Sequence, residues 1–118
     1  MLGRDFCLES LLGLNGYIFT YKDDYTIKIT AKQMPLSAQY PLGLKYSMVL
    51  LDRDGTRIYG IDNKVHNDKH KAARDHKHIL GDRIQPYNFT DVGQLFSDFY
   101  DGADKTIKAI ERQYEHES

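Results

Sequence analysis

Apolar and polar residues alternate along two pairs of short segments in the first half of the chain. Residues 17–21 and 25–31 are rich in β-branched and aromatic side chains and are separated by a short polar turn. Residues 45–51 and 56–61 form a second pair, and the connection between them contains Asp54-Gly55. Asp-Gly supplies the positive φ that a tight turn needs. The pattern therefore predicts two antiparallel hairpins.

The last quarter of the chain follows a helical period. From Thr90 to about Tyr114, apolar residues recur every three or four positions and predict one long helix with Thr90 as its N-cap. Gly102 weakens the middle of such a helix by about 1 kcal/mol relative to Ala. We expect the stripe of Val92, Leu95, Phe96, Phe99, Ala103, Ile107 and Ile110 to pack on Ile27, Ile29, Val49, Leu51 and Ile58.

The remaining segments complete an α+β fold. Residues 3–13 predict a short N-terminal helix, residues 34–43 with their two prolines predict a loop, and residues 75–79 and 83–87 predict short edge strands. Strands followed by one long helix indicate an antiparallel sheet covered on one face. We expect about five strands, two hairpins plus an edge strand, covered by a long C-terminal and a short N-terminal helix. The histidine-containing segment would lie at the sheet edge.

Composition narrows the class of protein. A chain of 118 residues predicts a single domain over residues 1–118. The net charge of -1 argues against an overall electrostatic attraction to nucleic acid, so any polyanion contact would be local. The single cysteine, Cys7, excludes an internal disulfide. With no signal peptide or membrane-spanning run, we expect a soluble, cytoplasmic protein without membrane contact.

Histidines and cations concentrate directly after the second hairpin. Four of the five histidines fall between His66 and His78. Residues 64–78 also carry five cations, Lys64, Lys69, Lys71, Arg74 and Lys77, against Asp68 and Asp75. Imidazoles that titrate near neutrality among cations suit a phosphodiester substrate. The competing interpretation is a solvated loop whose charges serve solubility.

The order of these elements resembles the TumE family of toxins from toxin-antitoxin systems. The resemblance rests on the strand from Tyr46 to Leu51, the Asp54-Gly55 turn, the strand that ends in Asp62-Asn63, and then His66 and His76-Lys77-His78. It covers about residues 17–86. The chain departs from the expected pattern at Asp75, where the first of two adjacent histidines would stand.

The resemblance implies a small toxin that a partner antitoxin neutralises, often one with a helix-turn-helix. It also implies ribonuclease activity, with RNA as the substrate. In a ribonuclease that needs no metal, a base removes the 2′-hydroxyl proton, an acid protonates the leaving oxygen, and cations stabilise the phosphorus centre.

The histidines are the candidates for this chemistry. His76 and His78 are two residues apart, so in an extended segment both rings project from one face and Lys77 from the other. We expect His66 and His78 as the acid-base pair, with His76 as a further catalytic candidate and Asp62 orienting an imidazole. Candidate substrate contacts are Tyr46, Asn63, Arg74 and Lys77.

Three alternatives remain open at this level. Asp62 and Asn63 are also residues that cap turns locally. A divalent metal at His66, His76 and His78 would make the protein a metal-dependent nuclease, although we expect no cofactor. A non-catalytic module could instead bind nucleic acid or a protein, with a sheet edge accepting a strand from the antitoxin. A homodimer is also possible.

Overall fold

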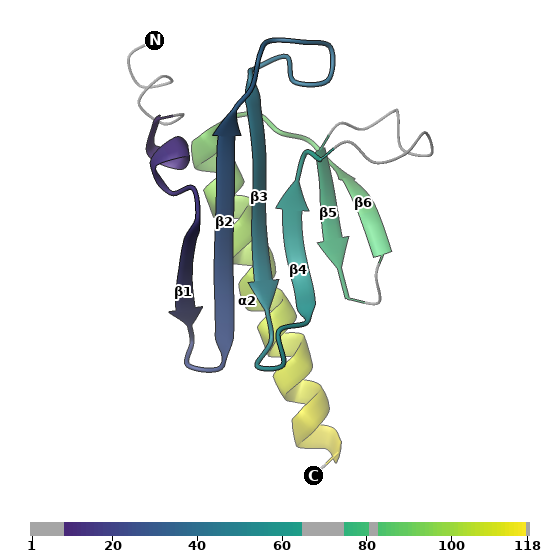
Figure 1. Cartoon of the computed structure of the whole chain (residues 1–118). Helices are drawn as coiled ribbons and strands as arrows, with labels where there is room; N and C mark the ends of the chain where they lie inside the picture. Colours follow the sequence, from purple (N-terminus) through teal and green to yellow (C-terminus); the bar gives the residue numbers. More distant parts are fainter. Residues whose placement is uncertain (1–8, 65–74, 81–82, 118) are drawn as a thin grey trace.

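The computed structural model describes residues 9–64, 75–80 and 83–117, which form one sheet and two helices (Figure 1). Every strand pairs antiparallel with the next strand in the chain, so the order in the sheet is the order in the sequence. A short helix covers residues 9–13, and α2 (Val92–Glu117) lies across one face of the sheet. The strands are β1 (Tyr17–Tyr21), β2 (Tyr25–Gln33), β3 (Leu44–Leu51), β4 (Arg57–Asp62), β5 (Asp75–Ile79) and β6 (Arg83–Tyr87).

Both predicted hairpins are confirmed, each with a turn that its residues explain. Between β1 and β2, a three-residue connection reverses the chain, and its first two residues, Lys22 and Asp23, take the positive φ values of 50° and 68° that tight hairpin turns use. Between β3 and β4, Gly55 has a φ of 82°. There the Asp52 carboxylate accepts hydrogen bonds of 2.9 Å from the backbone N–H groups of Asp54 and Thr56.

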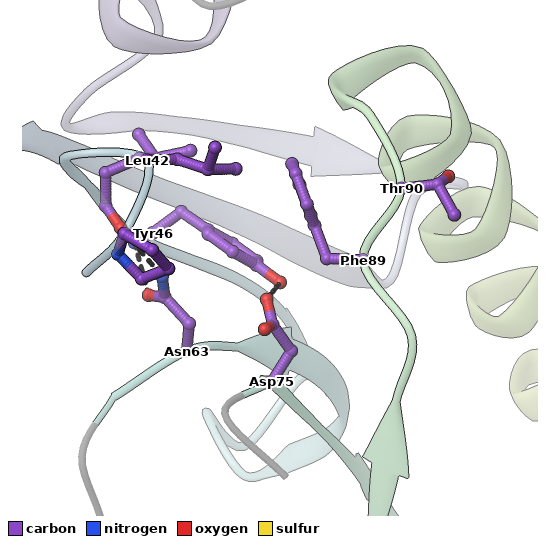
Figure 2. A pocket seen from close by; sticks show the side chains of 8 residues that line it. Leu42, Tyr46, Asn63, Asp75, Phe89 and Thr90 are labelled. Atoms are coloured by element: carbon purple, nitrogen blue, oxygen red, sulfur yellow. Dashed lines mark hydrogen bonds between the residues drawn. The ribbon is translucent and has the colours of Figure 1, made fainter. Parts of the chain in front are cut away.

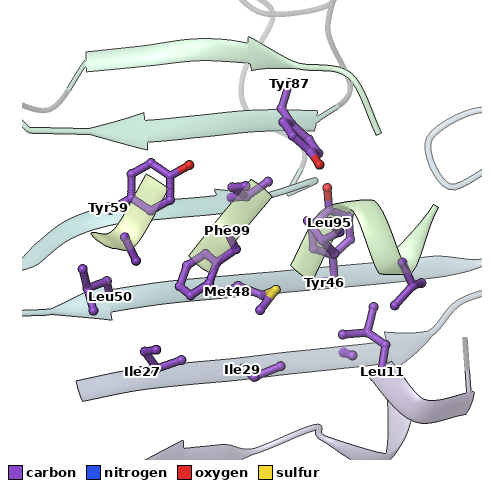
Figure 3. Packing of buried hydrophobic residues seen from close by; sticks show 14 of the residues in the cluster. Leu11, Ile27, Ile29, Tyr46, Met48, Leu50, Tyr59, Tyr87, Leu95 and Phe99 are labelled. Carbon is purple, nitrogen blue, oxygen red and sulfur yellow. The ribbon is translucent and has the colours of Figure 1, made fainter. Parts of the chain in front are cut away.

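The core lies between the sheet and α2. The predicted stripe is confirmed, because Val92, Leu95, Phe99, Ala103 and Ile107 are buried and Phe96 and Ile110 pack against them. Figure 3 shows Leu95 and Phe99 lying over the strands that carry Ile29 and Met48. Leu11 of the N-terminal helix closes one end of this cluster. No helix in the described ranges is long and apolar enough to cross a membrane.

In β3, the side of the strand that faces α2 is the opposite of the one that we predicted. Met48 and Leu50 are fully buried in the core, whereas Val49 and Leu51 are only half-buried and belong to the opposite face. The last four residues of β3 are all apolar, so this half of the strand alone does not show which two face the helix. The first half does, because Lys45 and Ser47 alternate with Leu44 and Tyr46. The buried positions Ile27, Ile29 and Ile58 are as expected.

The number of strands and the place of the histidine segment also differ from prediction. The sheet has six strands, and β5, which we expected at the edge, is paired on both sides. It pairs with β4, where His76 lies opposite Asp62, and with β6, where His76 lies opposite Pro86. His76 and His78 are therefore buried, at 3% and 4% exposure. The edges of the described sheet are β1 and β6, the latter as predicted.

Tyrosines of the two edge strands hold α2 against the sheet. The Tyr21 hydroxyl of β1 donates to Asp104 at 2.7 Å, and the Tyr87 hydroxyl of β6 donates to Asp98 at 2.6 Å. Burial, followed by the bond to Asp104, raises the pKa of Tyr21 to about 12. The helix is thus fixed at both sides of the sheet.

The N-cap of α2 differs from our prediction. It is not Thr90 but Asp91, whose carboxylate accepts a hydrogen bond of 2.8 Å from the Gln94 N–H. Gln94 is the third residue of the helix, which is the N–H that an N-cap side chain reaches.

Acid should weaken this attachment. The bond from Tyr87 lowers the pKa of Asp98 below its ordinary 3.8, and Lys22 and then Tyr21 lower the pKa of Asp104. Because the folded carboxyls bind protons less readily than the unfolded ones, their stabilisation is present above about pH 4 and is lost as the pH falls through their depressed values. Urea unfolding at neutral and acidic pH should therefore show that the double variant Asp98→Asn, Asp104→Asn loses less stability on acidification. Equal losses would contradict this origin.

Candidate functional site

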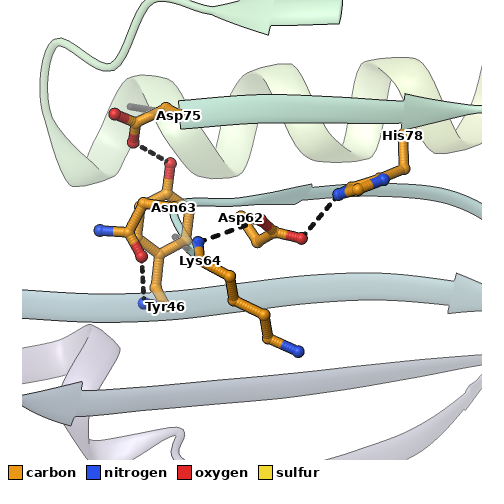
Figure 4. Close-up of polar contacts among 6 residues, drawn as sticks. All are labelled: Tyr46, Asp62, Asn63, Lys64, Asp75 and His78. Atoms are coloured by element: carbon orange, nitrogen blue, oxygen red, sulfur yellow. Dashed lines mark hydrogen bonds and ion pairs between the residues drawn. The ribbon is translucent and has the colours of Figure 1, made fainter. Parts of the chain in front are cut away.

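A histidine and an aspartate form a pair on the face of the sheet that α2 leaves uncovered, which we call the open face. The His78 Nε2 of β5 lies 2.8 Å from Oδ2 of Asp62, the last residue of β4 (Figure 4). Both side chains are about 95% buried. The carboxylate is an acceptor only, so the Nε2 nitrogen carries the proton in this bond. Neutral His78 consequently has its basic lone pair on Nδ1.

The backbone holds the carboxylate in place. The other oxygen of Asp62 accepts a hydrogen bond of 3.1 Å from the Lys64 N–H. His76 lies directly opposite Asp62 across the strand pair, and His78 lies opposite Gly60. Since side chains alternate along β5, both imidazoles project from the same face, with Cα atoms roughly 7 Å apart. This confirms their predicted common side. One carboxylate and two imidazoles therefore adjoin where β4 ends.

The next residue, Asn63, performs a different role on the other side of the sheet. Its side-chain oxygen accepts from the Tyr46 N–H at 2.9 Å, and its amide donates to the Leu44 carbonyl at 2.7 Å. Its own N–H donates to the Tyr46 carbonyl at 3.3 Å. Asn63 thus continues the β3–β4 pairing beyond the last strand residue, which holds Asp62 at its position.

A cavity of about 310 Å³ lies on the helix side of this point. Figure 2 shows the Tyr46 hydroxyl bonded to Asp75 within it, at 2.5 Å, with the Phe89 ring alongside. Burial and the Asp75 carboxylate both raise the pKa of Tyr46 above its ordinary value. The tyrosine is therefore a neutral donor. The lining residues are Pro41, Leu42, Leu44, Tyr46, Asn63, Asp75, Phe89 and Thr90.

The sequence that forms this sheet and this site also matches a known protein family. Residues 11–109 match the toxin TumE family. The chain belongs to the TumE toxin family. The match includes all six strands and most of α2. No curated protein and no solved structure matches the chain.

As a member of the TumE family, this chain is the toxin of a toxin-antitoxin system, which implies an antitoxin as its partner. The matched region contains Asp62, His76 and His78 as well as the cavity. Neither the reaction nor the residues that perform it follow from membership alone.

The TumE-family structure brings some of the predicted site residues together and separates others. Asp62, His76 and His78 share the open face, whereas Tyr46 and Asn63 line the cavity on the helix side. The site residues His66 and Arg74 that we predicted lie outside the described residues, and so does His70.

Lys77 also lies on the helix side, with its Nζ 6.0 Å from the centre of the Tyr87 ring. It therefore faces away from the histidines. Within residues 9–64, 75–80 and 83–117 the toxin has no group of three His, Cys, Asp or Glu placed to hold a metal ion.

Sequence reasoning missed the contacts of Asp75 and Phe89 with Tyr46. Asp75 bonds to a tyrosine 29 residues earlier, and Phe89 packs on the same ring, with centroids 5.7 Å apart. No local pattern announces contacts of such sequence separation. The only signal was the unusual aspartate before the His-Lys-His triplet.

Proposed function

We propose that this toxin is an endoribonuclease that cleaves RNA by metal-independent acid-base catalysis. The observation that carries the proposal is the buried Asp62–His78 pair at 2.8 Å. A carboxylate that accepts from one nitrogen of an imidazole fixes its orientation and stabilises the imidazolium that forms on proton transfer. His78 then acts as the base through Nδ1, and Asp62 positions it.

The reaction needs a second imidazole as the acid. His76 is on the same face as His78, and His66 is the candidate from the sequence. The base takes the 2′-hydroxyl proton, the 2′-oxygen attacks phosphorus, and the acid gives its proton to the leaving 5′-oxygen. One fragment ends in a 2′,3′-cyclic phosphate and the other in a 5′-hydroxyl. Because Asp62 and His78 are buried, RNA reaches them only after the atoms that cover them move aside.

A direct test is to analyse the ends of the RNA fragments. Purified toxin, freed from its antitoxin, is incubated with a labelled single-stranded RNA in excess chelator. We expect cleavage to persist, the fragments to carry cyclic phosphates, and 2′-O-methylated RNA to resist. Loss of activity in chelator, restored by a divalent cation, would replace this mechanism with that of a metal-dependent nuclease. His76→Gln and His66→Gln, tested separately, identify the acid.

A second candidate function is a non-catalytic interaction module, favoured by the burial of both imidazoles. The edge strand β1 exposes Tyr17 and Ile18, at 54% and 60%, as a surface to which an antitoxin strand could add. A homodimer through such an edge stays a prediction. Toxicity in cells without any change in RNA, relieved by the antitoxin, would favour this candidate over the enzyme.

A further inference from the structure

Cations collect on the open face of the sheet, around the histidines. Along β2, the buried Ile27, Ile29 and Ala31 point to α2, whereas Lys28, Thr30 and Lys32 point away and are exposed. By the register, Lys45 of β3 shares this open face, because it is the direct partner of Lys32. The strand alternation that builds the core thus places three lysines on one surface.

Arg57 belongs to the same surface. A Cβ atom added to Gly60 would lie 3.7 Å from the Arg57 Cδ, so the arginine stem passes beside Gly60. Position 60 is the direct partner of His78 across the β4–β5 pair. Glycine at this position adds no side chain of its own beside the histidine, and the Arg57 stem passes there.

Among the residues that the structure describes, this surface has few acids to neutralise its cations. Across the described strands, the register gives the open face one carboxylate, Asp62, which already pairs with His78. The four cations form no ion pair with the described residues. Other carboxylates lie on α2, at Asp98, Asp101 and Asp104, and in the hairpin turns. The described carboxylates thus lie mainly on the helix side, where Lys105, Lys108 and Arg112 accompany them, whereas the described cations of the open face have few acids beside them.

The like-charged pair Lys32 and Lys45 points to an external anion. Like charges placed directly opposite on neighbouring strands repel and destabilise the pair. An anion held between them would remove that repulsion.

The rows of the sheet connect these cations to the catalytic candidates. Thr30, Ser47, Asp62 and His76 form one continuous cross-strand row. The neighbouring row on one side of it contains Lys28 and His78. The neighbouring row on its other side contains Lys32 and Lys45. At about 4.8 Å between strands and about 3.4 Å per residue along a strand, roughly 12 Å separate the Cα atoms of Lys45 on β3 and His76 on β5. Backbone phosphates bound along β2 and β3 would lead a strand toward the buried histidines.

We propose that the open face of the sheet, through Lys28, Lys32, Lys45 and Arg57, binds the backbone of single-stranded RNA and directs it to the Asp62–His78 pair. The inference rests on the proposed ribonuclease function for its endpoint, and on charge complementarity for its ligand. A single strand fits best, because in-line attack by a 2′-oxygen needs a backbone that can bend into that geometry. The proposed contacts are to the backbone, because the described strands place no aromatic ring beside the four cations on this face.

The test compares two charge-matched triple variants. In the first, Lys28, Lys32 and Lys45 become Gln; in the second, Lys105, Lys108 and Arg112 on the exposed side of α2 become Gln. Each lowers the net charge by three. The probe is 2′-O-methylated single-stranded RNA, which the proposed reaction cannot cleave, so binding is measured without turnover on the protein with its histidines intact. Thermal unfolding shows that both variants are folded.

We expect the sheet variant to bind roughly tenfold or more weakly at low salt, and the slope of log affinity against log salt to fall by about 2, at about 0.7 per lost phosphate contact on a single strand. The helix variant should retain the slope of the original protein. Equal behaviour of the two variants overturns the inference, even if the toxin cleaves RNA. A sheet variant that loses antitoxin binding but keeps RNA binding also overturns it. Weaker RNA binding in a toxin that cleaves no RNA would uphold the binding face and refute the proposed reaction.

Discussion

Replacing Asp62 by Asn should lower the rate of RNA cleavage by roughly 100- to 10,000-fold. The amide is nearly isosteric, but it can present an N–H group to the Nε2 of His78, where the carboxylate presents only an acceptor 2.8 Å away. The imidazole then favours the tautomer with its proton on Nδ1, which removes the base. The measurement is the single-turnover rate on labelled RNA, together with the loss of toxicity on expression.

The control is Asp101→Asn on α2, the same chemical exchange at an exposed carboxylate that pairs with Lys105. It should cleave as the original protein does. Breaking a buried pair costs about 3–5 kcal/mol when one charge is left without its partner, so thermal unfolding accompanies each rate. If Asp62→Asn does not fold, His78→Gln provides the test. A folded variant of either residue that cleaves at the original rate would refute the proposed mechanism.

Replacing Gly102 by Ala should destabilise the fold by about 1–3 kcal/mol, although helix propensity alone predicts a gain of about 1 kcal/mol. A Cβ atom at this position would lie 2.1 Å from the Tyr59 hydroxyl oxygen and 2.2 Å from the Cζ of that ring. Tyr59 is buried at 3% exposure and packs against Phe99, so it has little room to move. Urea unfolding measures the change in free energy.

The cause can be isolated with a double-mutant cycle. In a Tyr59→Leu background the ring is gone, so the alanine at position 102 should recover most of its helix propensity. Gly93→Ala is the matched control in the first turn of α2, where a Cβ atom meets only the Asp91 carboxylate at 3.3 Å; it should be nearly neutral. Equal destabilisation by Gly102→Ala with and without the Tyr59 ring would exclude the clash as its cause.

The fold could be predicted as far as local periodicity extends. The stripe along α2 and the alternation along β2 each have one apolar side, so they identify their buried faces without a structure. In β3 both sides are apolar only over residues 48–51, and a prediction from these residues alone chose the wrong side. Lys45 and Ser47, earlier in the same strand, mark the side that faces away from α2. The place of residues 75–79 was the larger error, because β6, which was itself expected as an edge strand, pairs with β5 and makes β5 an interior strand.

The candidate site could be predicted in part for the same reason. The spacing of His76 and His78 fixes their common side of an extended strand, and the position of Asp62 at the end of β4 brings it opposite them. The polarity of the histidine segment led us to expect it at a sheet edge. Imidazoles can nevertheless be buried where a carboxylate partners one of them. The contact of Tyr46 with Asp75 joins strands that are not neighbours, and its geometry depends on β4 ending between them.

The strand order has a consequence for how this toxin folds. Since neighbours in space are neighbours in sequence, no pairing has to close a loop that contains another strand, and the chain loses little loop entropy at each addition. The sheet can assemble progressively during synthesis, before its covering helix has been translated. Until α2 arrives, the apolar side of the nascent sheet stays open to water and to other chains.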